Sequence, residues 1–263
     1  MMQIGEVISF LEQKFPPAQQ DGWDNSGIQV GDIHQEVKGV LVALDITEAV
    51  VQEAVKWSCN LIVTHHPLLF HATKRVTPED YIHRSLMLAI KHDITIYSAH
   101  TSLDNDAEGV NHFWAQWMGV LNTRPILPSN ESEDRQVGAG IIGELSEPIS
   151  ISDLVQRMKD FQPIQRISHS EILKEEIKTV AYCGGSGAFL MREAARQGAD
   201  IFITGEAKYN DYYDARDLVT LMVIGHFESE ELIKSLLYNV LCQKKGNFVV
   251  RCSSSCENPV KYI

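Results

Sequence analysis

The chain has 263 residues, enough for one large α/β domain or two small ones with a buried core. Its 35 Asp and Glu residues against 23 Lys and Arg residues give a formal net charge of −12. This charge argues against broad nucleic-acid or anionic-membrane binding by the outer surface, although it does not exclude a nucleotide held locally by a metal. Five scattered cysteines, an N-terminal stretch without a basic leader and the lack of a long apolar run predict a cytoplasmic protein with no membrane partner.

The first half of the chain alternates predicted strands and helices. A helix is expected over residues 4–15, ending at the prolines of positions 16 and 17. Strands are predicted at 37–44, 61–64 and 94–97, and helices at 47–57, 81–91 and 107–118. The polar segment 22–27 is interpreted as a connecting loop. Residues 121–136 are polar and hold two prolines, so we interpret them as a linker.

The pattern resumes beyond this segment. Helices are predicted at 151–161, 186–197, 209–216 and 228–241, and strands at 137–144, 164–168, 177–183, 200–204, 219–224 and 247–252. We therefore expect an α/β fold of two similar, interlinked lobes, residues 1–124 and 125–263. Whether the last strand packs back on the first lobe is left open.

An internal repeat supports two similar lobes. A shift of 140 residues aligns positions 37–66 with 177–206 without a gap, so that Thr64 meets Thr204. A second correspondence aligns 94–104 with 220–230, which ends each segment in a histidine followed four residues later by an acid. Because β-α-β units resemble one another in composition, chance similarity is the alternative to duplication.

Two adjacent histidines, His65 and His66, follow the apolar run Leu61–Thr64. Such a run predicts a buried parallel strand, and active sites in open α/β sheets lie at the carboxyl ends of strands. Consecutive strand residues point to opposite faces, so both imidazoles can reach one site only where the chain leaves the strand. Neutral imidazole is the commonest metal ligand in proteins, and two histidines in an ordinary loop are the alternative.

Two further pairs carry the same kind of donor. His226 and Glu230 follow the predicted strand at 219–224, and a spacing of four places them on one helix face. His100 and Asp104 have the same spacing after the strand at 94–97. A glutamate favoured by a helix N-terminus is the alternative for Glu230 taken alone.

The number of candidate metal ligands predicts a centre that holds two metal ions. His65, His66, Asp104, His226 and Glu230 are five protein ligands, more than the three usual for a catalytic mononuclear zinc site. We expect His66 and Asp104 on one ion and His65 and His226 on the other. Glu230 would bridge the two ions, roughly 3.5–4 Å apart. Mixed nitrogen and oxygen donors suit Zn, Fe, Mn, Co or Ni equally.

Other residues border this predicted centre. We expect His100 to orient Asp104 rather than to be a sixth ligand. Glu206 occupies the repeat position that matches His66 and could border the cleft or form a surface ion pair. The glycine-rich segment 183–187 is interpreted as a tight strand-to-helix turn, with an anion cradle as the alternative.

Six short motifs together resemble a known family, the GTP cyclohydrolase I type 2 homologue (Nif-three-like) family, in its compact form without an inserted domain. The likeness covers nearly the whole chain and rests on segments 23–31, 64–67, 100–104, 183–187, 204–206 and 225–230. It implies two α/β lobes, a dinuclear metal centre and a ring-shaped homohexamer. Carried over motif by motif, its ligands are the five residues counted above, and Glu206 retains the charge of an acid found in relatives.

Three interpretations of function remain open. The favoured one is a metal-dependent hydrolase of a nucleotide or phosphoester, with metal-bound water as the attacking group and no catalytic side chain assigned. The second is a metal-binding or trafficking protein without turnover, and the third is a regulatory scaffold for other proteins. Cyclohydrolase chemistry rests on the family likeness alone.

Overall fold

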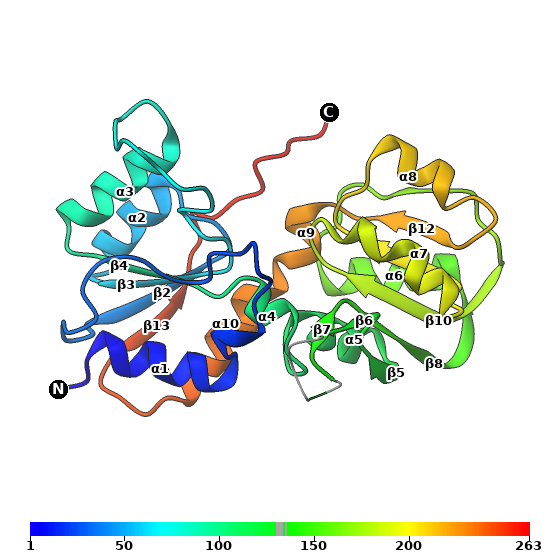
Figure 1. Cartoon of the computed structure of the whole chain (residues 1–263), viewed down its shortest axis with the longest axis horizontal. Helices are drawn as coiled ribbons and strands as arrows, with labels where there is room; N and C mark the ends of the chain where they lie inside the picture. The colour runs from blue at the N-terminus through cyan, green and yellow to red at the C-terminus, as the bar shows by residue number, and fades with distance from the viewer. Residues whose placement is uncertain (130–133, 135) are drawn as a thin grey trace. The chain divides into compact units, whose positions relative to one another are not determined.

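The structure, a computed structural model, describes residues 1–129, 134 and 136–263 and divides into two compact units. The first unit holds Met1–Leu103 and Ile233–Pro259, and the second holds Asp104–Leu232 and Val260–Ile263. Each unit is a mixed β-sheet with helices against it, which confirms the predicted α/β class (Figure 1). Among the described residues, no helix has the length and apolar composition needed to cross a membrane.

The first unit is built on a five-stranded sheet. Its strands, in spatial order, are β1 (Gly27–Val30), β4 (Thr95–Ser98), β3 (Leu61–Thr64), β2 (Gly39–Ala43) and β13 (Val249–Cys252). β1 is antiparallel to β4, and the remaining pairs are parallel. Every residue of β2, β3 and β4 is buried, as expected for parallel strands covered on both faces.

Helices cover both faces of this sheet. In Figure 1, α2 and α3 lie on one side, and α1 and α10 lie on the other. Thr47 caps α2 by accepting a hydrogen bond from the Val50 N–H, and Asp80 caps α3 through the His83 N–H. The helices are α1 (Ile4–Lys14), the 3-10 turn η1 (Pro17–Gln19), α2 (Glu48–Lys56), α3 (Tyr81–Lys91), the short α4 (Thr101–Asp104) and α10 (Leu232–Gln243).

The second unit is built on a six-stranded sheet. Its strands, in spatial order, are β5 (Val120–Arg124), β8 (Ile141–Ser150), β10 (Glu176–Cys183), β11 (Ile201–Thr204), β12 (Thr220–Val223) and β9 (Ser168–His169). The β10, β11 and β12 strands are parallel, and β9 is antiparallel to β12. A separate pair joins β6 (Leu127–Pro128) to β7 (Gly138–Ala139).

Two neighbouring residues of β10 show which helices cover this sheet. The Trp114 ring of α5 stacks on Tyr182 with ring centroids 4.0 Å apart, whereas Ala181 belongs to a buried cluster with Met191 of α7. Because adjacent strand residues point to opposite faces, α5 and α7 cover opposite sides. The helices are α5 (Val110–Met118), α6 (Ile151–Phe161), η2 (Gly187–Leu190), α7 (Met191–Arg196), α8 (Tyr209–Asp214) and α9 (His226–Glu230).

The two sheets repeat one arrangement. Val40 pairs with Leu61 in the first sheet, and 140 residues later Val180 pairs with Ile201 in the second. The side chain of Asn60 accepts a hydrogen bond from the Lys38 N–H, just as Asp200 accepts one from Lys178. Each sheet also has an antiparallel strand beside the last of its parallel strands, β1 beside β4 and β9 beside β12. This correspondence supports the duplication predicted from the sequence.

The predicted linker and lobe boundary differ from the structure. The first residues of the predicted linker form β5, which pairs with β8, while residues 130–133 and 135 lie outside the described part. β5 is an edge strand with mainly exposed or half-buried side chains, so its polar composition resembles that of a loop. The boundary therefore falls between Leu103 and Asp104, and β13 returns to pair with β2 in the first unit.

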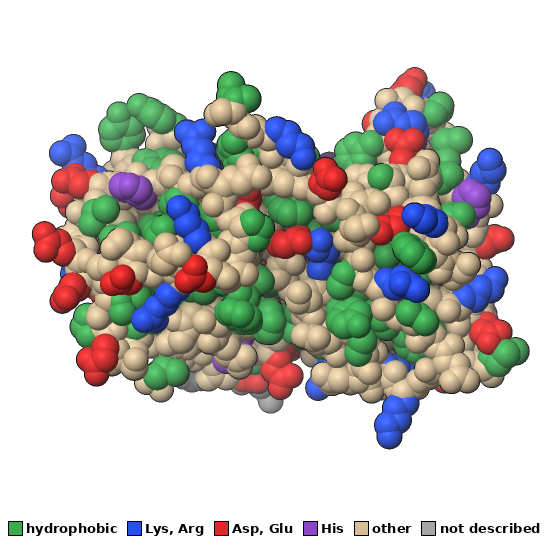
Figure 2. All heavy atoms as spheres, turned by 180° about the vertical axis from the view of Figure 1, so that it is seen from behind, with side chains coloured by type: hydrophobic (Ala, Val, Ile, Leu, Met, Phe, Trp, Pro, Cys, Tyr) green, Lys and Arg blue, Asp and Glu red, His purple; other side chains and the backbone are tan. Residues whose placement is uncertain are grey.

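Two predicted helices are interrupted. The helix expected at 186–197 is a 3-10 turn followed by α7, and the one expected at 228–241 is divided into α9 and α10. The expected strand at 164–168 is reduced to the two residues of β9, and the helix expected from residue 107 begins at Val110. On the face drawn in Figure 2, acidic and basic side chains are interspersed with apolar ones.

Candidate metal centre

Three histidines gather at the carboxyl ends of two paired strands in the first unit. His65 and His66 follow β3, and His100 follows β4. Thr64 and Ser98, the last residues of these strands, pair with each other across the sheet. The segments that follow the two strands therefore leave the sheet side by side. The three imidazoles each offer a nitrogen, and these nitrogens lie within 4.8 Å of one another. The position predicted for the histidine pair is therefore confirmed.

Each of these rings is fixed through its Nδ1 atom. The Nδ1 of His65 lies 2.9 Å from the backbone oxygen of Ala99. The Nδ1 of His66 lies 2.7 Å from Asp45 Oδ1, and that of His100 lies 2.7 Å from Asp24 Oδ1. Since carbonyl and ionised carboxylate oxygens only accept hydrogen bonds, Nδ1 carries the proton in each neutral ring and the lone pair is on Nε2. This arrangement orients metal-ligating histidines in proteins.

Asp24 and Asp45 are site residues that the sequence interpretation missed. The Asp24 side chain is fully buried and accepts hydrogen bonds from Ser26 Oγ, at 2.7 Å, and Thr101 Oγ1, at 2.6 Å. Burial raises the pKa of Asp24, but the hydrogen bonds from His100, Thr101 and Ser26 outweigh it and bring the pKa well below its usual value. The charged carboxylate is therefore part of a fixed network. The aspartate lies in the polar segment 22–27, which was interpreted as a connecting loop, and in the family motif at 23–31.

His100 has a different neighbour from the one expected. We expected it to orient Asp104, whereas its Nδ1 is held by Asp24 and its ring lies 4.9 Å from that of His65, centroid to centroid. His100 is thus a member of the histidine group and a candidate ligand in its own right.

The second unit carries its own donor group on α9. Both His226 and Glu230 belong to this helix, as their spacing predicts, with His226 Nε2 3.0 Å from Glu230 Oε2. The other ring nitrogen, Nδ1, lies 3.1 Å from Glu206 Oε1. Glu230 is only 4% exposed, whereas the Glu206 side chain is 57% exposed. Glu206 therefore contacts the ring of a proposed ligand from an exposed position.

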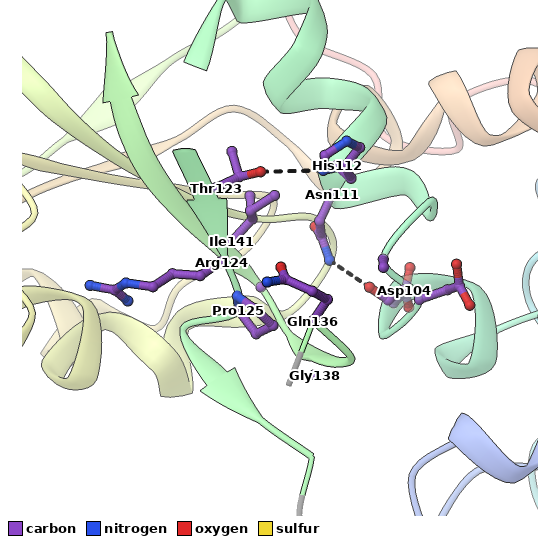
Figure 3. A pocket seen from close by; sticks show the side chains of 12 residues that line it. Asp104, Asn111, His112, Thr123, Arg124, Pro125, Gln136, Gly138 and Ile141 are labelled. Carbon is purple, nitrogen blue, oxygen red and sulfur yellow. Dashed lines mark hydrogen bonds between the residues drawn. The ribbon is translucent and has the colours of Figure 1, made fainter. Parts of the chain in front are cut away.

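Asp104 ends α4 and lies on the wall of a cavity of about 200 Å³ within the second unit (Figure 3). Its backbone oxygen accepts a hydrogen bond from Asn111 Nδ2 at 3.0 Å. On another wall, Thr123 Oγ1 lies 3.3 Å from His112 Nδ1. Asp104, a proposed metal ligand, thus lies among both polar and apolar residues that line the cavity.

The glycine-rich segment 183–187 is a tight turn that packs against Glu230. Gly185 has a φ of +58°, and a Cβ atom there would lie 2.3 Å from Glu230 Oε1. The Gly185 N–H donates to Ser229 Oγ, and the Gly187 N–H donates to Thr204 Oγ1. These two backbone amides donate to side chains of the protein itself. This supports the interpretation of the segment as a tight turn rather than as an anion-binding site. The turn allows the glutamate to approach the backbone closely.

The donor sets of both units fit a transition metal. Three oriented imidazoles in one unit and an imidazole–carboxylate pair in the other are the nitrogen and oxygen donors that Zn, Fe, Mn, Co and Ni accept. Within the first unit the structure brings together His65 and His66 with His100. Within the second it brings together His226, Glu230 and Glu206.

Comparisons with known proteins agree with these observations. The sequence profile of the Duf34/NIF3 (NGG1p interacting factor 3) family matches residues 2–259. A Clostridium perfringens protein named GTP cyclohydrolase 1 type 2 homolog is 32% identical over 230 residues, covering 87% of each chain. A Streptococcus pneumoniae protein of the same name is 30% identical and is matched over the whole of both chains, which fits the compact form.

A solved structure shows the same fold. The crystal structure of a hypothetical protein from Staphylococcus aureus superposes with a TM-score of 0.90 at 30% identity, covering 100% of this chain and 99% of the other. The sequence match and the structural match both extend over nearly the full length. The chain therefore belongs to the Duf34/NIF3 family.

Proposed function

We propose that the chain binds two divalent transition-metal ions and hydrolyses a nucleotide or phosphoester. His66 and Asp104 would hold one ion, His65 and His226 the other, and Glu230 would bridge them. The observation that carries this proposal is that the proposed ligands His65 and His66, and the candidate sixth ligand His100, each hold Nδ1 against an oxygen acceptor. This puts the lone pair of each neutral ring on Nε2. The relatives' name, GTP cyclohydrolase 1 type 2 homolog, supports a nucleotide substrate.

The protein side chains have separate tasks in this proposal. When bound, such ions lower the pKa of a coordinated water toward about 7 and polarise the substrate. Asp24 and Asp45 hold the imidazoles in one orientation, so little reorganisation is needed on binding. Glu206, beside His226, would hold the Nδ1 side of that ring.

Two further parts of the proposal concern the protein's setting. We infer a ring-shaped homohexamer, which rests on the family resemblance and is tested by light scattering coupled to size exclusion. We also infer a cytoplasmic location. It is supported by the five cysteines, none of which forms a disulfide within the described part of the chain.

The test is turnover by metal-loaded protein on a nucleoside triphosphate and on bis(p-nitrophenyl) phosphate. We expect hydrolysis that depends on added metal and falls by at least about 100-fold in Glu230→Gln, which removes the charge of a ligand and keeps its shape. Glu147→Gln, an exposed glutamate of the same unit, should behave as the wild type. Metal binding without turnover on either substrate would contradict the hydrolase and favour a storage or trafficking protein.

A further inference from the structure

An exposed aromatic pair borders the histidine group of the first unit. Trp23 is 62% exposed and Phe70 is 41% exposed, although both are large hydrophobic side chains. Their ring centroids lie 5.9 Å apart in an edge-to-face arrangement, and each lies 6.0 Å from the His100 ring. The aromatic pair therefore lies directly beside the histidine group. Clustered apolar exposure of this kind marks a binding surface more often than isolated exposed residues do.

The backbone beneath both rings is fixed. Asp24 follows Trp23, and its buried side chain is hydrogen-bonded to Ser26, Thr101 and His100. The segment that carries Phe70 is tied to the same loop. Asn25 Nδ2 donates to the Leu69 oxygen at 2.8 Å, and the Leu69 N–H donates to Gln29 Oε1 at 3.1 Å.

Gln29 closes this network. Its Nε2 donates to the Asn25 oxygen at 2.8 Å, so Gln29 links the loop that carries Trp23 to the segment that carries Phe70. Two rings held on fixed loops lose little conformational entropy when a ligand covers them. Such preorganisation strengthens binding.

We propose that Trp23 and Phe70 form a stacking subsite for a nucleobase, the flat heteroaromatic part of the substrate. This inference deepens the proposed function and rests on it. The polar ring of His100 lies beside both aromatic rings, so the surface suits a ligand with a π-face and a polar edge. A phosphoester without a ring would leave both aromatic side chains uncovered. Stacking of a base on an aromatic side chain contributes about 1–3 kcal/mol.

The test compares adenosine and guanosine 5′-monophosphates with ribose 5-phosphate, which has the same sugar and phosphate but no base. Affinities are measured by calorimetry for wild type, Trp23→Ala, Trp23→Phe and Phe70→Leu, all metal-loaded. We expect Trp23→Ala to weaken nucleotide binding about 5- to 100-fold, as the loss of one stacking contact predicts. Ribose 5-phosphate affinity should stay unchanged, and Trp23→Phe should recover most of the nucleotide affinity.

Trp57→Ala is the matched control, because Trp57 is a 45% exposed tryptophan of the same unit that packs under Arg251. Equal nucleotide affinity in wild type and Trp23→Ala would overturn the subsite, as would equal losses for nucleotide and ribose 5-phosphate. A change of oligomeric state in Trp23→Ala without a change in nucleotide affinity would also overturn it, since the pair would then serve assembly.

A second readout separates this inference from the metal proposal. Stacking on Trp23 should quench its fluorescence, and stacking itself needs no metal. Quenching by nucleotide is therefore measured also in chelator-treated protein, with Trp23→Phe as the reference that lacks this fluorophore. Quenching in chelator-treated protein would support the subsite even if metal analysis contradicted the dinuclear centre. Normal metal content with no quenching would contradict the subsite alone.

Discussion

His100 Nδ1 lies 2.7 Å from Asp24 Oδ1, and the side chain of this aspartate is fully buried. The two residues are 76 positions apart, so the fold joins a loop before β1 to the end of β4. Carboxylate partners of this kind set the tautomer and the direction of a metal-binding imidazole.

Replacing Asp24 by Asn should weaken metal binding. The amide keeps the size of the side chain but removes the charge that fixes His100, and comparable changes cost about 10- to 100-fold in metal affinity. Competition with a chromophoric chelator measures the change. Asp160→Asn, at an exposed position on α6, is the control. Unchanged affinity in Asp24→Asn would show that this carboxylate does not orient a ligand.

Gly185→Ala should disturb Glu230 specifically. The new Cβ would lie 2.3 Å from Glu230 Oε1 at a backbone φ of +58°. Gly198→Ala is a close match, because Gly198 also has a positive φ, +88°, but no atom lies within 4 Å of its Cβ position. Both variants should lose about 1–3 kcal/mol of stability from the backbone. Only Gly185→Ala should also lose bound metal, as elemental analysis would show, and equal metal content in both would contradict this role of the turn.

Glu53 should make the first unit sensitive to acid. It accepts hydrogen bonds from the side chains of Ser253 and Ser254 and from the Ser254 and Ser255 N–H groups, just after β13. Burial raises its pKa, but these hydrogen bonds outweigh burial and lower the pKa to about 2. Because the folded-state pKa lies below the unfolded value, this stabilisation is full above about pH 4.5 and is lost as the pH falls toward 2.

Glu53→Gln should lower the free energy of unfolding at pH 7 by about 1–3 kcal/mol, as expected for hydrogen bonds to a charged group. The variant should also lose less stability than the wild type between pH 4.5 and pH 2. Urea titrations across this range measure both effects. Glu48→Gln is the control, because Glu48 pairs with Arg84 at the surface and should contribute less than about 1 kcal/mol. Parallel pH profiles for wild type and Glu53→Gln would contradict the assignment.

Local signals in the sequence predicted much of the fold. The helices α3 and α6 span the predicted residues. Asp80 and Ser150 cap their first turns through side-chain hydrogen bonds, which explains where each helix begins. The edge strand β5 was missed since its exposed residues lack the apolar alternation of a half-buried strand. The return of β13 to β2 depends on pairing between distant segments, which periodicity does not report.

The repeat also carries one residue more than strand pairing alone indicates. Thr64 and Thr204 correspond in the repeat, and they pair with Ser98 of β4 and Val223 of β12, so Ser98 corresponds to Val223. His100 lies two residues after Ser98, whereas His226 lies three residues after Val223. The two histidines therefore correspond only if Gly225 is an added residue. Gly225 has a φ of +104°, which fits a turn inserted between strand and helix. The histidines themselves were found from the sequence because they directly follow strands. Asp24 and Asp45 were not, because their hydrogen bonds to histidines span distant parts of the chain.

The most direct test of the proposed centre is metal content per chain, measured by elemental mass spectrometry on untagged wild-type protein and Glu230→Ala. We expect about two transition-metal ions per wild-type chain and a clear loss in the variant, since a carboxylate shared by two ions is removed. Fewer than about half an ion per wild-type chain, even after reconstitution with Zn, Mn, Fe, Co or Ni, would contradict the dinuclear centre.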